Sequence, residues 1–426
     1  MISLPSALLR LALASLLFVS SAGIAAKKKS SKVRSAAKTL SIAAPVTLAG
    51  AAAFQKASAS KAGPEQALSG VLEAIEGNKL DLAIQRVEAL LAAHPNFRLA
   101  HLIRGDLLTA RARPLETFGN VPKTVPREKV EELRAEALLR VRAFRDRPNG
   151  ERVPRYILQM HPEQRHALVV DSRRSRLYVF ENVGGRPQFV ADYYVTLGKN
   201  GVDKAREGDQ KTPIGVYHVT ANLPRQKLTD FYGSGAFPIN YPNAWDKRLG
   251  RNGHGIWLHG TPSDTYSRPP RASDGCIVLA NADLDAVGRS VQIGLTPVII
   301  SDEIDWTDAK SLEAERKGLA ETFEAWRAAW EKRDTDRYLS HYAPRFNSGD
   351  QNLAEWSAHK RMVNAGKEWI KVGVSKVAML QDPREKFVVV SFDQDYRSSN
   401  LSNVMRKRQY WMKTDGRWRI LYEGSA

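Results

Sequence analysis

The spacing of hydrophobic residues separates the chain into regions with different predicted structures. In the first region, Leu68, Val71, Leu72 and Ile75 recur at the three- and four-residue steps of one helix face, and Gly77 ends the run. The same helical spacing returns in 80–91, 100–112 and 127–144. The pattern therefore predicts a helical module over residues 64–150.

Near His166 the hydrophobic period changes from that of a helix to that of a strand. Residues 167–171 and 176–181 are hydrophobic runs on either side of a short polar segment, which predicts a β-hairpin. Further strands are predicted at 189–197, 215–220, 256–259, 276–279 and 296–301. Asn281 is predicted to be the N-cap of a short helix, 282–289. Many short strands with few helices predict a β-rich domain over 160–304.

After residue 306 the helices come first and the strands follow. A long amphipathic helix is predicted from one stripe of large apolar residues, Leu319, Phe323, Trp326 and Trp330. A second short helix passes through Tyr338 and Tyr342. Polar/apolar alternation then predicts strands at 369–380, 386–397, 404–413 and 417–422, the last two joined by a hairpin turn at Asp415-Gly416. This order predicts an α+β domain with a strongly curved antiparallel sheet over 311–426.

The first residues have the composition of an export signal. Arg10 precedes a short apolar core, 11–19, and the small residues of 20–26 follow, so residues 1–26 are predicted to be a signal peptide. The apolar core is shorter than the roughly 20 residues that cross a bilayer. An uncleaved N-terminal anchor is the alternative. The Ala/Ser/Lys-rich segment 27–63 has few large apolar groups and is predicted to be a basic, disordered linker.

The charge of the chain is unusual for a globular protein, although its composition is not. Hydrophobic residues make up 43% and charged residues 26%, which is enough apolar material for folded domains with cores, but the net charge is +18. A positive surplus of this size favours polyanions, namely nucleic acid, acidic lipid or the carboxylate-rich bacterial wall. Predicted export to the periplasm or cell envelope excludes nucleic acid. The linker is then either a contact to the wall or membrane surface or a merely solvated spacer.

Cys276 is the only cysteine of the chain. An exported protein with one cysteine has no partner for a disulfide within the chain, so the thiol is either inert and buried or kept for chemistry. A thiol nucleophile needs a base, and His259 at the end of a predicted strand can supply it. The carbonyl of Gly260 can hold the second imidazole nitrogen. The backbone N–H groups of Gly275 and Cys276 can stabilise an oxyanion.

Two segments together resemble the L,D-transpeptidase (YkuD) family. His259-Gly260, a connector and Ser273-Asp274-Gly275-Cys276 match its catalytic signature, and Thr212-Pro213-Ile214-Gly215 matches its upstream Thr-Pro-x-Gly segment. The resemblance implies a β-rich catalytic domain that needs neither metal nor organic cofactor. It implies that Cys276 attacks the L,D bond of a peptidoglycan stem tetrapeptide, releases D-alanine and forms an acyl-enzyme. His259 is then the base, Gly260 orients it, and Gly275 and Cys276 hold the oxyanion.

The resemblance implies a peptidoglycan L,D-transpeptidase, although the sequence leaves the acceptor of the acyl group open. An amine acceptor gives a 3-3 cross-link or attaches an acceptor protein, which is L,D-transpeptidation. Water gives a tripeptide, which is L,D-carboxypeptidase or amidase activity. A third alternative is a cell-wall binding protein without catalysis, but such a protein needs neither Cys276 nor His259.

The signature departs from the common family pattern at two positions. Asp274 stands where members commonly carry His, and Val278 stands where they commonly carry Arg, a natural partner for a substrate carboxylate. Arg268 and Arg271 in the connector can replace that positive charge, although loop arginines are often only solvated. We therefore predict Ser273, Asp274, His254, Arg268 and Arg271 as substrate-binding residues.

The flanking regions carry weaker resemblances. The helix–turn–helix rhythm of 64–150 resembles a tetratricopeptide repeat with fewer copies than an independent solenoid needs. The last domain resembles the NTF2-like (SnoaL-like) cone, and it lacks an evident acid/base pair, so we expect it to serve binding or assembly. The whole order is similar to that of a cell-shape L,D-carboxypeptidase of Helicobacter. The sequence leaves a homodimer open.

Overall fold

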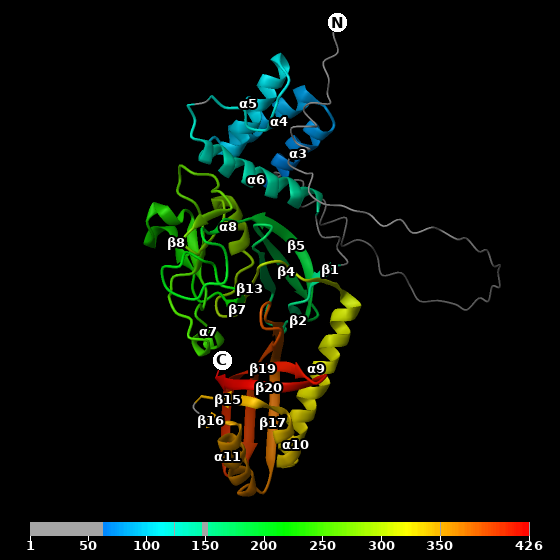
Figure 1. Ribbon diagram of the computed structural model, residues 1–426. Helices are drawn as coiled ribbons and strands as arrows, with labels where there is room; N and C mark the ends of the chain where they lie inside the picture. The colour runs from blue at the N-terminus through cyan, green and yellow to red at the C-terminus, as the bar shows by residue number, and fades with distance from the viewer. Residues whose placement is uncertain (1–62, 123, 147–151, 350, 426) are drawn as a thin grey trace, which may run out of the picture. The chain divides into compact units, whose positions relative to one another are not determined.

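The computed structural model describes residues 63–122, 124–146, 152–349 and 351–425. The predicted signal peptide and nearly all of the predicted linker lie outside the described residues. The chain divides into two compact units, with the division between Val141 and Arg142. Figure 1 labels the helices and many of the strands of both units.

The first unit is helical, as predicted. It contains α3 (Pro64–Glu76), α4 (Leu80–Ala93), α5 (Arg98–Ala112) and most of α6 (Arg127–Arg145). The apolar stripe of α3 is buried, including Leu68 and Val71. Among the helices that the structure describes, none is both long enough and apolar enough to cross a bilayer. The tetratricopeptide assignment stays a prediction, because helices alone do not define that repeat.

The second unit begins with a five-stranded sheet in the order β5-β4-β3-β13-β7. The predicted hairpin is present as β3 (His166–Asp171) and β4 (Arg176–Val183), and β5 (Arg186–Tyr194) extends it. β13 (Pro297–Ser301) pairs in parallel with β3, and β7 (Gly215–His218) pairs antiparallel with β13. All five residues of β13 are buried, as expected of a central strand.

A smaller sheet carries the predicted catalytic segments. Its order is β12-β10-β9-β8, with β10 (Trp257–His259) between β12 (Ile277–Val278) and β9 (Gly235–Pro238), and with β8 (Leu223–Pro224) at the edge. β9 was not predicted, because its sequence is short and contains both Gly and Pro. Leu258 and Ile277 from this sheet and Leu168 and Val298 from the larger sheet belong to one buried core. The shared core fixes the position of both catalytic segments.

The prediction that Asn281 caps the following helix is wrong. Helix α8 spans Asn281–Gly288, and its N-cap is Ala280, which has no side chain able to accept the cap hydrogen bond. Asn281 is therefore the first helical residue, and its side chain makes contacts elsewhere. Those contacts belong to the site described below.

The last part of the chain packs three helices against a curved seven-stranded sheet. The helices are α9 (Ala309–Glu331), α10 (Thr335–Ser340) and α11 (Leu353–Ala365). The sheet has the order β16-β15-β20-β19-β18-β17-β2, and its strands in this region are β15 (Tyr342–Ser348), β16 (Gln351–Asn352), β17 (Ile370–Gln381), β18 (Val388–Ser398), β19 (Leu401–Thr414) and β20 (Arg417–Ser425). Its core is rich in aromatic residues, including Trp326, Tyr338 and Trp411. The predicted α+β domain is confirmed.

One strand of this sheet comes from residues that directly precede the predicted catalytic domain. β2 (Ile157–Gln159) pairs antiparallel with β17, with Ile157 opposite Leu380 and Gln159 opposite Met379. The Gln159 amide also donates a 3.0 Å hydrogen bond to the Val377 carbonyl. Figure 1 shows β2 and β17 side by side. Residues before the predicted start of the catalytic domain thus extend the C-terminal sheet.

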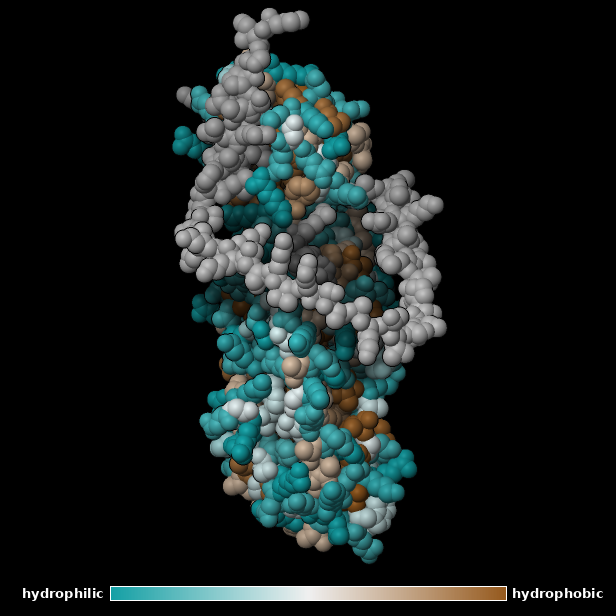
Figure 2. All heavy atoms as spheres, turned by 90° about the vertical axis from the view of Figure 1, so that its right-hand side faces the viewer, coloured by the Kyte–Doolittle hydropathy of each residue, from teal (hydrophilic) through white to brown (hydrophobic). Residues whose placement is uncertain are grey.

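Hydrophobic side chains appear only in separate patches on the face shown in Figure 2, where most of the described surface is hydrophilic. Exposed large apolar residues are scattered along the described chain, as at Phe231, Ile293, Met362 and Val404. Single exposed apolar residues of this kind are normal for a folded protein in water. Phe231 differs from the others because it lies beside the candidate site.

Candidate active site

Two adjacent parallel strands bring Cys276 and His259 together. β10 and β12 pair with Leu258 opposite Ile277 and His259 opposite Val278. Cys276 directly precedes β12, so the same register places it opposite Trp257. Side chains two positions apart on a strand point to the same face, and so do paired residues. The thiol and the imidazole therefore lie on one face of the small sheet, on neighbouring strands and two residues apart along the strand direction.

A backbone carbonyl fixes the orientation of the His259 ring. Nδ1 lies 2.7 Å from the Gly260 carbonyl oxygen, and because a carbonyl only accepts, Nδ1 carries the proton in this hydrogen bond. Nε2 is then the nitrogen that can accept a proton. Tyr232 packs edge-on against the imidazole at 5.1 Å and restricts its rotation further.

Asn281 holds the backbone next to Gly260 in place. Its Oδ1 accepts the N–H groups of Ser234 at 2.9 Å and Thr261 at 3.2 Å, and its Nδ2 donates to the Thr261 carbonyl at 2.9 Å. A Cβ at position 260 would collide with this amide oxygen. Asn281 is therefore a positioning residue for the carbonyl that orients His259. The only sequence signal was a polar residue directly after the apolar run 276–280.

The upstream Thr-Pro-x-Gly segment supports residues 273–276, the loop that carries the thiol, which we call the thiol loop. Thr212 is fully buried, and its hydroxyl accepts the Gly198 N–H and donates to the Gly275 carbonyl, each at 3.0 Å. Gly275 has a φ of +126°, and a Cβ there would lie 2.7 Å from the Lys211 carbonyl oxygen. Only glycine fits this position, since it has no Cβ and tolerates positive φ.

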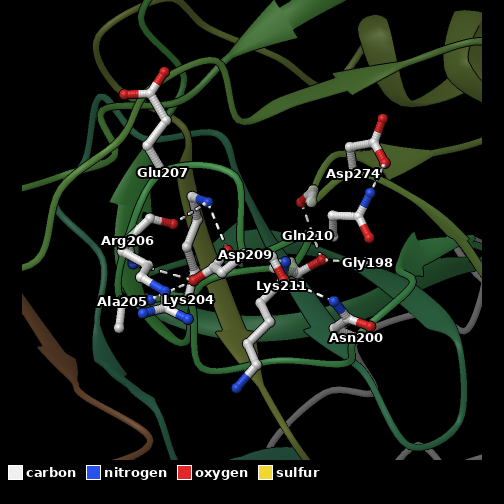
Figure 3. Close-up of polar contacts among 12 residues, drawn as sticks. Gly198, Asn200, Lys204, Ala205, Arg206, Glu207, Asp209, Gln210, Lys211 and Asp274 are labelled. Carbon is white, nitrogen blue, oxygen red and sulfur yellow. Dashed lines mark hydrogen bonds and ion pairs between the residues drawn. The ribbon is translucent and has the colours of Figure 1, made fainter.

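Asp274 connects the thiol loop to the neighbouring segment that contains Lys199 and Gln210 (Figure 3). Its Oδ1 accepts from Lys199 Nζ at 2.9 Å and from Gln210 Nε2 at 3.0 Å. The carboxylate is exposed, so each contact contributes modestly to stability. Asp274 therefore makes contacts between two loops.

The same view shows an ion pair between Lys204 and Asp209 in the segment that Asp274 contacts (Figure 3). The Lys204 ammonium is almost completely buried and lies 2.8 Å from Asp209 Oδ1 and 3.0 Å from the Arg206 carbonyl. Burial alone would raise the pKa of Asp209. Hydrogen bonds from Lys204 and from the N–H groups of Ala205, Arg206 and Lys211 outweigh burial and hold that pKa well below its usual range. Lys204 also lowers the pKa of Cys276, which places its charge near the thiol.

The thiol and the imidazole are both neutral near pH 7. Burial raises the pKa of Cys276 to about 11, although a hydrogen bond from the Trp257 backbone and the charges of Arg268 and Lys204 act in the opposite direction. Burial, assisted by the positive charge of Arg268 and opposed by the hydrogen bond to Gly260, lowers the pKa of His259 to about 4. The Cys276 Sγ lies 3.3 Å from the Gly255 carbonyl, to which the thiol donates. The resting pair is therefore a thiol beside a neutral base.

The two arginines of the connector, Arg268 and Arg271, have different surroundings. The Arg268 guanidinium lies 4.8 Å above the Phe231 ring, and its charge affects both Cys276 and His259. No carboxylate in the described part of the chain lies within ion-pair distance of it. Arg271 instead donates to Ser172, at 3.2 Å from its hydroxyl and 3.4 Å from its carbonyl. Only Arg268 is beside the thiol and the imidazole.

The remaining predicted substrate residues differ in their surroundings. Ser273 is buried, and its hydroxyl donates to the Cys276 carbonyl at 2.6 Å and accepts the Gly275 N–H at 3.2 Å. His254 is largely exposed, with Nδ1 3.5 Å from Glu207 Oε1, and it precedes the glycine whose carbonyl accepts the thiol. Ser273 therefore shapes the thiol loop from inside, while His254 lies on its open side.

An aromatic wall that was not predicted completes the site. Phe231 and Tyr232 lie 5.1 Å apart, and Tyr232 lies 4.9 Å from Trp257. The Phe231 side chain is 48% exposed although it lies 5.8 Å from the His259 ring, so an apolar surface faces solvent directly beside the base. Among the described residues, no group of three or more His, Cys, Asp and Glu side chains could hold a metal ion.

The site combines a thiol, a neutral imidazole with a fixed tautomer, and the backbone N–H groups of Gly275 and Cys276. These are the parts of a cysteine acyl-transfer site. The L,D-transpeptidase catalytic domain (YkuD) family matches residues 165–300, and the Cds6 C-terminal NTF2-like domain family matches residues 318–424. The chain belongs to the YkuD family and carries a C-terminal NTF2-like domain. Members of the YkuD family modify peptidoglycan in the cell envelope, so the chain belongs to a family of peptidoglycan-modifying enzymes.

Solved structures with the same two-part order are similar over most of their length. Bd1075 of Bdellovibrio bacteriovorus is 30% identical, with a TM-score of 0.57 over 65% of this chain and 98% of that chain. Pgp2 of Campylobacter jejuni, a helical cell shape determining protein, is 26% identical, with a TM-score of 0.55 over 64% of this chain and 95% of that chain. YafK of Escherichia coli (strain K12), described as a candidate L,D-transpeptidase, is 28% identical over 31% of this chain. The chain spans about half the length of YafK, 53%.

Proposed function

We propose that the protein is an exported enzyme that cleaves the L,D bond of peptidoglycan stem tetrapeptides through an acyl-enzyme on Cys276. The observation that carries this proposal is the position of Cys276 and His259 on one face of two paired strands, with Nδ1 of His259 already held by Gly260. Exported family members that act on peptidoglycan support the substrate class.

The proposed acylation begins with neutral reactants. His259 Nε2 takes the Cys276 proton as Sγ attacks the carbonyl carbon of the L,D bond. The Cys276 N–H stabilises the oxyanion, and the Gly275 N–H contributes once its hydrogen bond to Ser273 is released. The imidazolium then gives its proton to the amine of D-alanine, which leaves, and a thioester remains on Cys276.

We propose water as the main acceptor of the acyl group. Nε2 deprotonates the water, hydroxide attacks the thioester, and the tripeptide leaves with the thiol regenerated. The similarity of both parts of the chain to a protein that determines helical cell shape supports a role in shaping the wall, which trimming of stem peptides would serve. Transfer to an amine, which would form 3-3 cross-links or attach a protein, is the second candidate and is supported by the transpeptidase domain match.

The products distinguish the two outcomes. We expect the purified protein, incubated with disaccharide tetrapeptides, to give disaccharide tripeptides and free D-alanine by mass spectrometry. Cross-linked dimers with loss of one D-alanine would instead identify a transpeptidase. Cys276→Ala should abolish either product while its thermal unfolding midpoint stays close to that of the wild type. Equal product formation by the Cys276→Ala protein would show that the assignment of the nucleophile is wrong.

Arg268 is proposed to bind the free carboxylate of the donor stem peptide. Its guanidinium is held over Phe231 beside Cys276 and His259 and has no carboxylate partner of its own in the described chain. Loss of a charge-assisted hydrogen bond costs about 1.5–3 kcal/mol, so Arg268→Gln should raise KM by roughly tenfold or more. Arg271→Gln is the matched control, because Arg271 contacts Ser172. Equal KM values for the two variants would exclude this role of Arg268.

A further inference from the structure

A cavity of about 230 Å³ lies between the large catalytic sheet and the outer face of the NTF2-like sheet. Val216, His218 and Asn240 line it from the catalytic part, and Arg406, Arg408 and Tyr410 line it from β19. The hydrophobic core of the NTF2-like domain, on the other face of its sheet, is separate from this cavity. Alternate residues of β19 point the other way, and Lys407, Gln409 and Trp411 are buried on that side.

The cavity is positively charged and has no acidic wall. Arg406 and Arg408 supply the charge, His218 lines the cavity as a neutral imidazole near pH 7, and no carboxylate residue lines it. In the described chain neither arginine lies within ion-pair distance of a carboxylate. Asp393, the cross-strand neighbour of Arg406, is 3.5 Å from the Lys376 ammonium instead, and Lys376 also pairs with Glu163 at 2.9 Å. The nearest acidic groups are therefore engaged by another cation.

The neutral polar groups of the wall are already engaged in the fold. Asn243 caps helix α7 (Ala244–Arg248) and donates to the Val216 carbonyl at 3.1 Å. Gln164 donates to the Leu295 carbonyl, and Asn240 accepts the His218 N–H at 2.7 Å. His218 and the two arginines are the basic side chains of the wall, and Arg408 also hydrogen-bonds the Tyr410 hydroxyl. Burial, together with the charges of Arg408 and Arg406, lowers the pKa of His218 to about 4.

We propose that this cavity binds a small organic oxyanion, carrying carboxylate or phosphate groups, through Arg406, Arg408 and His218. Arginine presents a planar fork of donors that matches a carboxylate or phosphate in two hydrogen bonds. The cavity is polar, lies between two folded parts of one unit and has a size suited to a small molecule rather than a polymer. A bound anion would neutralise the arginines and join the catalytic part to β19.

Such binding would stabilise the interface between the catalytic part and the NTF2-like sheet, which already has aromatic contacts. Trp245 of α7 stacks on Tyr410 at 5.2 Å and packs edge-on against Phe387 at 4.6 Å. An anion bound next to Tyr410 would add charge-assisted hydrogen bonds across the same interface. Because a ligand that binds only the folded state raises stability by mass action, the site can be detected through unfolding.

The test uses the whole protein with the Cys276→Ala change, so that no substrate is consumed. Citrate, inorganic phosphate and disaccharide tripeptide are titrated separately by calorimetry and by thermal unfolding. We expect citrate or phosphate to bind and to raise the unfolding midpoint. Binding of the disaccharide tripeptide that is lost with the same arginines would identify a wall peptide as the source of the carboxylate.

Arg406→Gln and Arg408→Gln, alone and combined, should weaken anion binding by roughly tenfold or more for each arginine. Arg397→Gln is the matched control, because Arg397 lies on the same sheet, is exposed and pairs with Asp395. The single variants keep the test valid if the double variant does not fold. Absence of binding by all three probes, or equal affinity in the variants and the control, would overturn the proposal. Neither result depends on the reaction at Cys276.

Discussion

Replacing His259 with alanine is expected to lower the rate of D-alanine release by on the order of a thousandfold. The thiol beside it has a pKa of about 11, so little thiolate exists near pH 7 without a base to take the proton. The Gly260 carbonyl leaves Nε2 as the nitrogen that accepts. Product formation from disaccharide tetrapeptide, measured by mass spectrometry over time, gives the rate.

The matched control is His254→Ala, because His254 is an exposed histidine whose ring lies near Glu207 and, within the described chain, not beside a backbone carbonyl that fixes its tautomer. We expect this variant to retain far more activity than His259→Ala. If both variants lost activity equally, the assignment of the base to His259 would not stand. A His259→Ala protein with full activity would have the same consequence.

The two pKa values also predict how the thiol reacts with an alkylating reagent. The pKa of His259 is lowered to about 4 and that of Cys276 is raised to about 11, so both groups stay neutral between these values. The rate of alkylation by iodoacetamide should therefore keep rising with pH through the neutral range and above it. A thiolate–imidazolium pair formed before substrate binds would give a plateau near neutral pH instead. Such a plateau would contradict the neutral resting pair.

The sequence predicted those features that depend on neighbouring residues. The β3–β4 hairpin, the four helices of the first unit and the long strands of the last domain all appear where the hydrophobic period placed them. Cys276 and His259 were predicted because their motifs are local. The strand pairing that joins them could not be predicted from the sequence, since β10 and β12 are only three and two residues long.

Features that depend on contacts across the fold were not predicted. Arg268 and Arg271 are equivalent as loop arginines in the sequence, and only the fold directs one to Phe231 and the other to Ser172. Asn281 was assigned to a helix cap because the sequence does not contain the path of the backbone at Thr261. The addition of β2 to the C-terminal sheet joins residues separated by more than half the chain. No local pattern encodes such pairing.

Gly275→Ala is expected to destabilise the fold and to lower the rate more than a hundredfold. The added Cβ would lie 2.7 Å from the Lys211 carbonyl oxygen and 3.1 Å from Ile256 Cδ1, in a backbone conformation with φ of +126°. Strained backbone and overpacking together should cost about 2–5 kcal/mol of unfolding free energy. Relief of the clash would move the Cys276 N–H and Sγ, and displacements near 1 Å can cost about a hundredfold in rate.

Gly250→Ala separates the collision from the backbone strain. Gly250 also has a positive φ, +71°, but a Cβ there would meet no atom within 4 Å. We therefore expect Gly250→Ala to lose stability by strain alone and to keep near-normal turnover. Chemical unfolding measures the first effect, and product formation measures the second. Equal losses of turnover in the two variants would mean that the close contact between Gly275 and Lys211 does not position the nucleophile. A larger loss at Gly275 would follow directly from the packing of the thiol loop against the Thr-Pro-x-Gly segment.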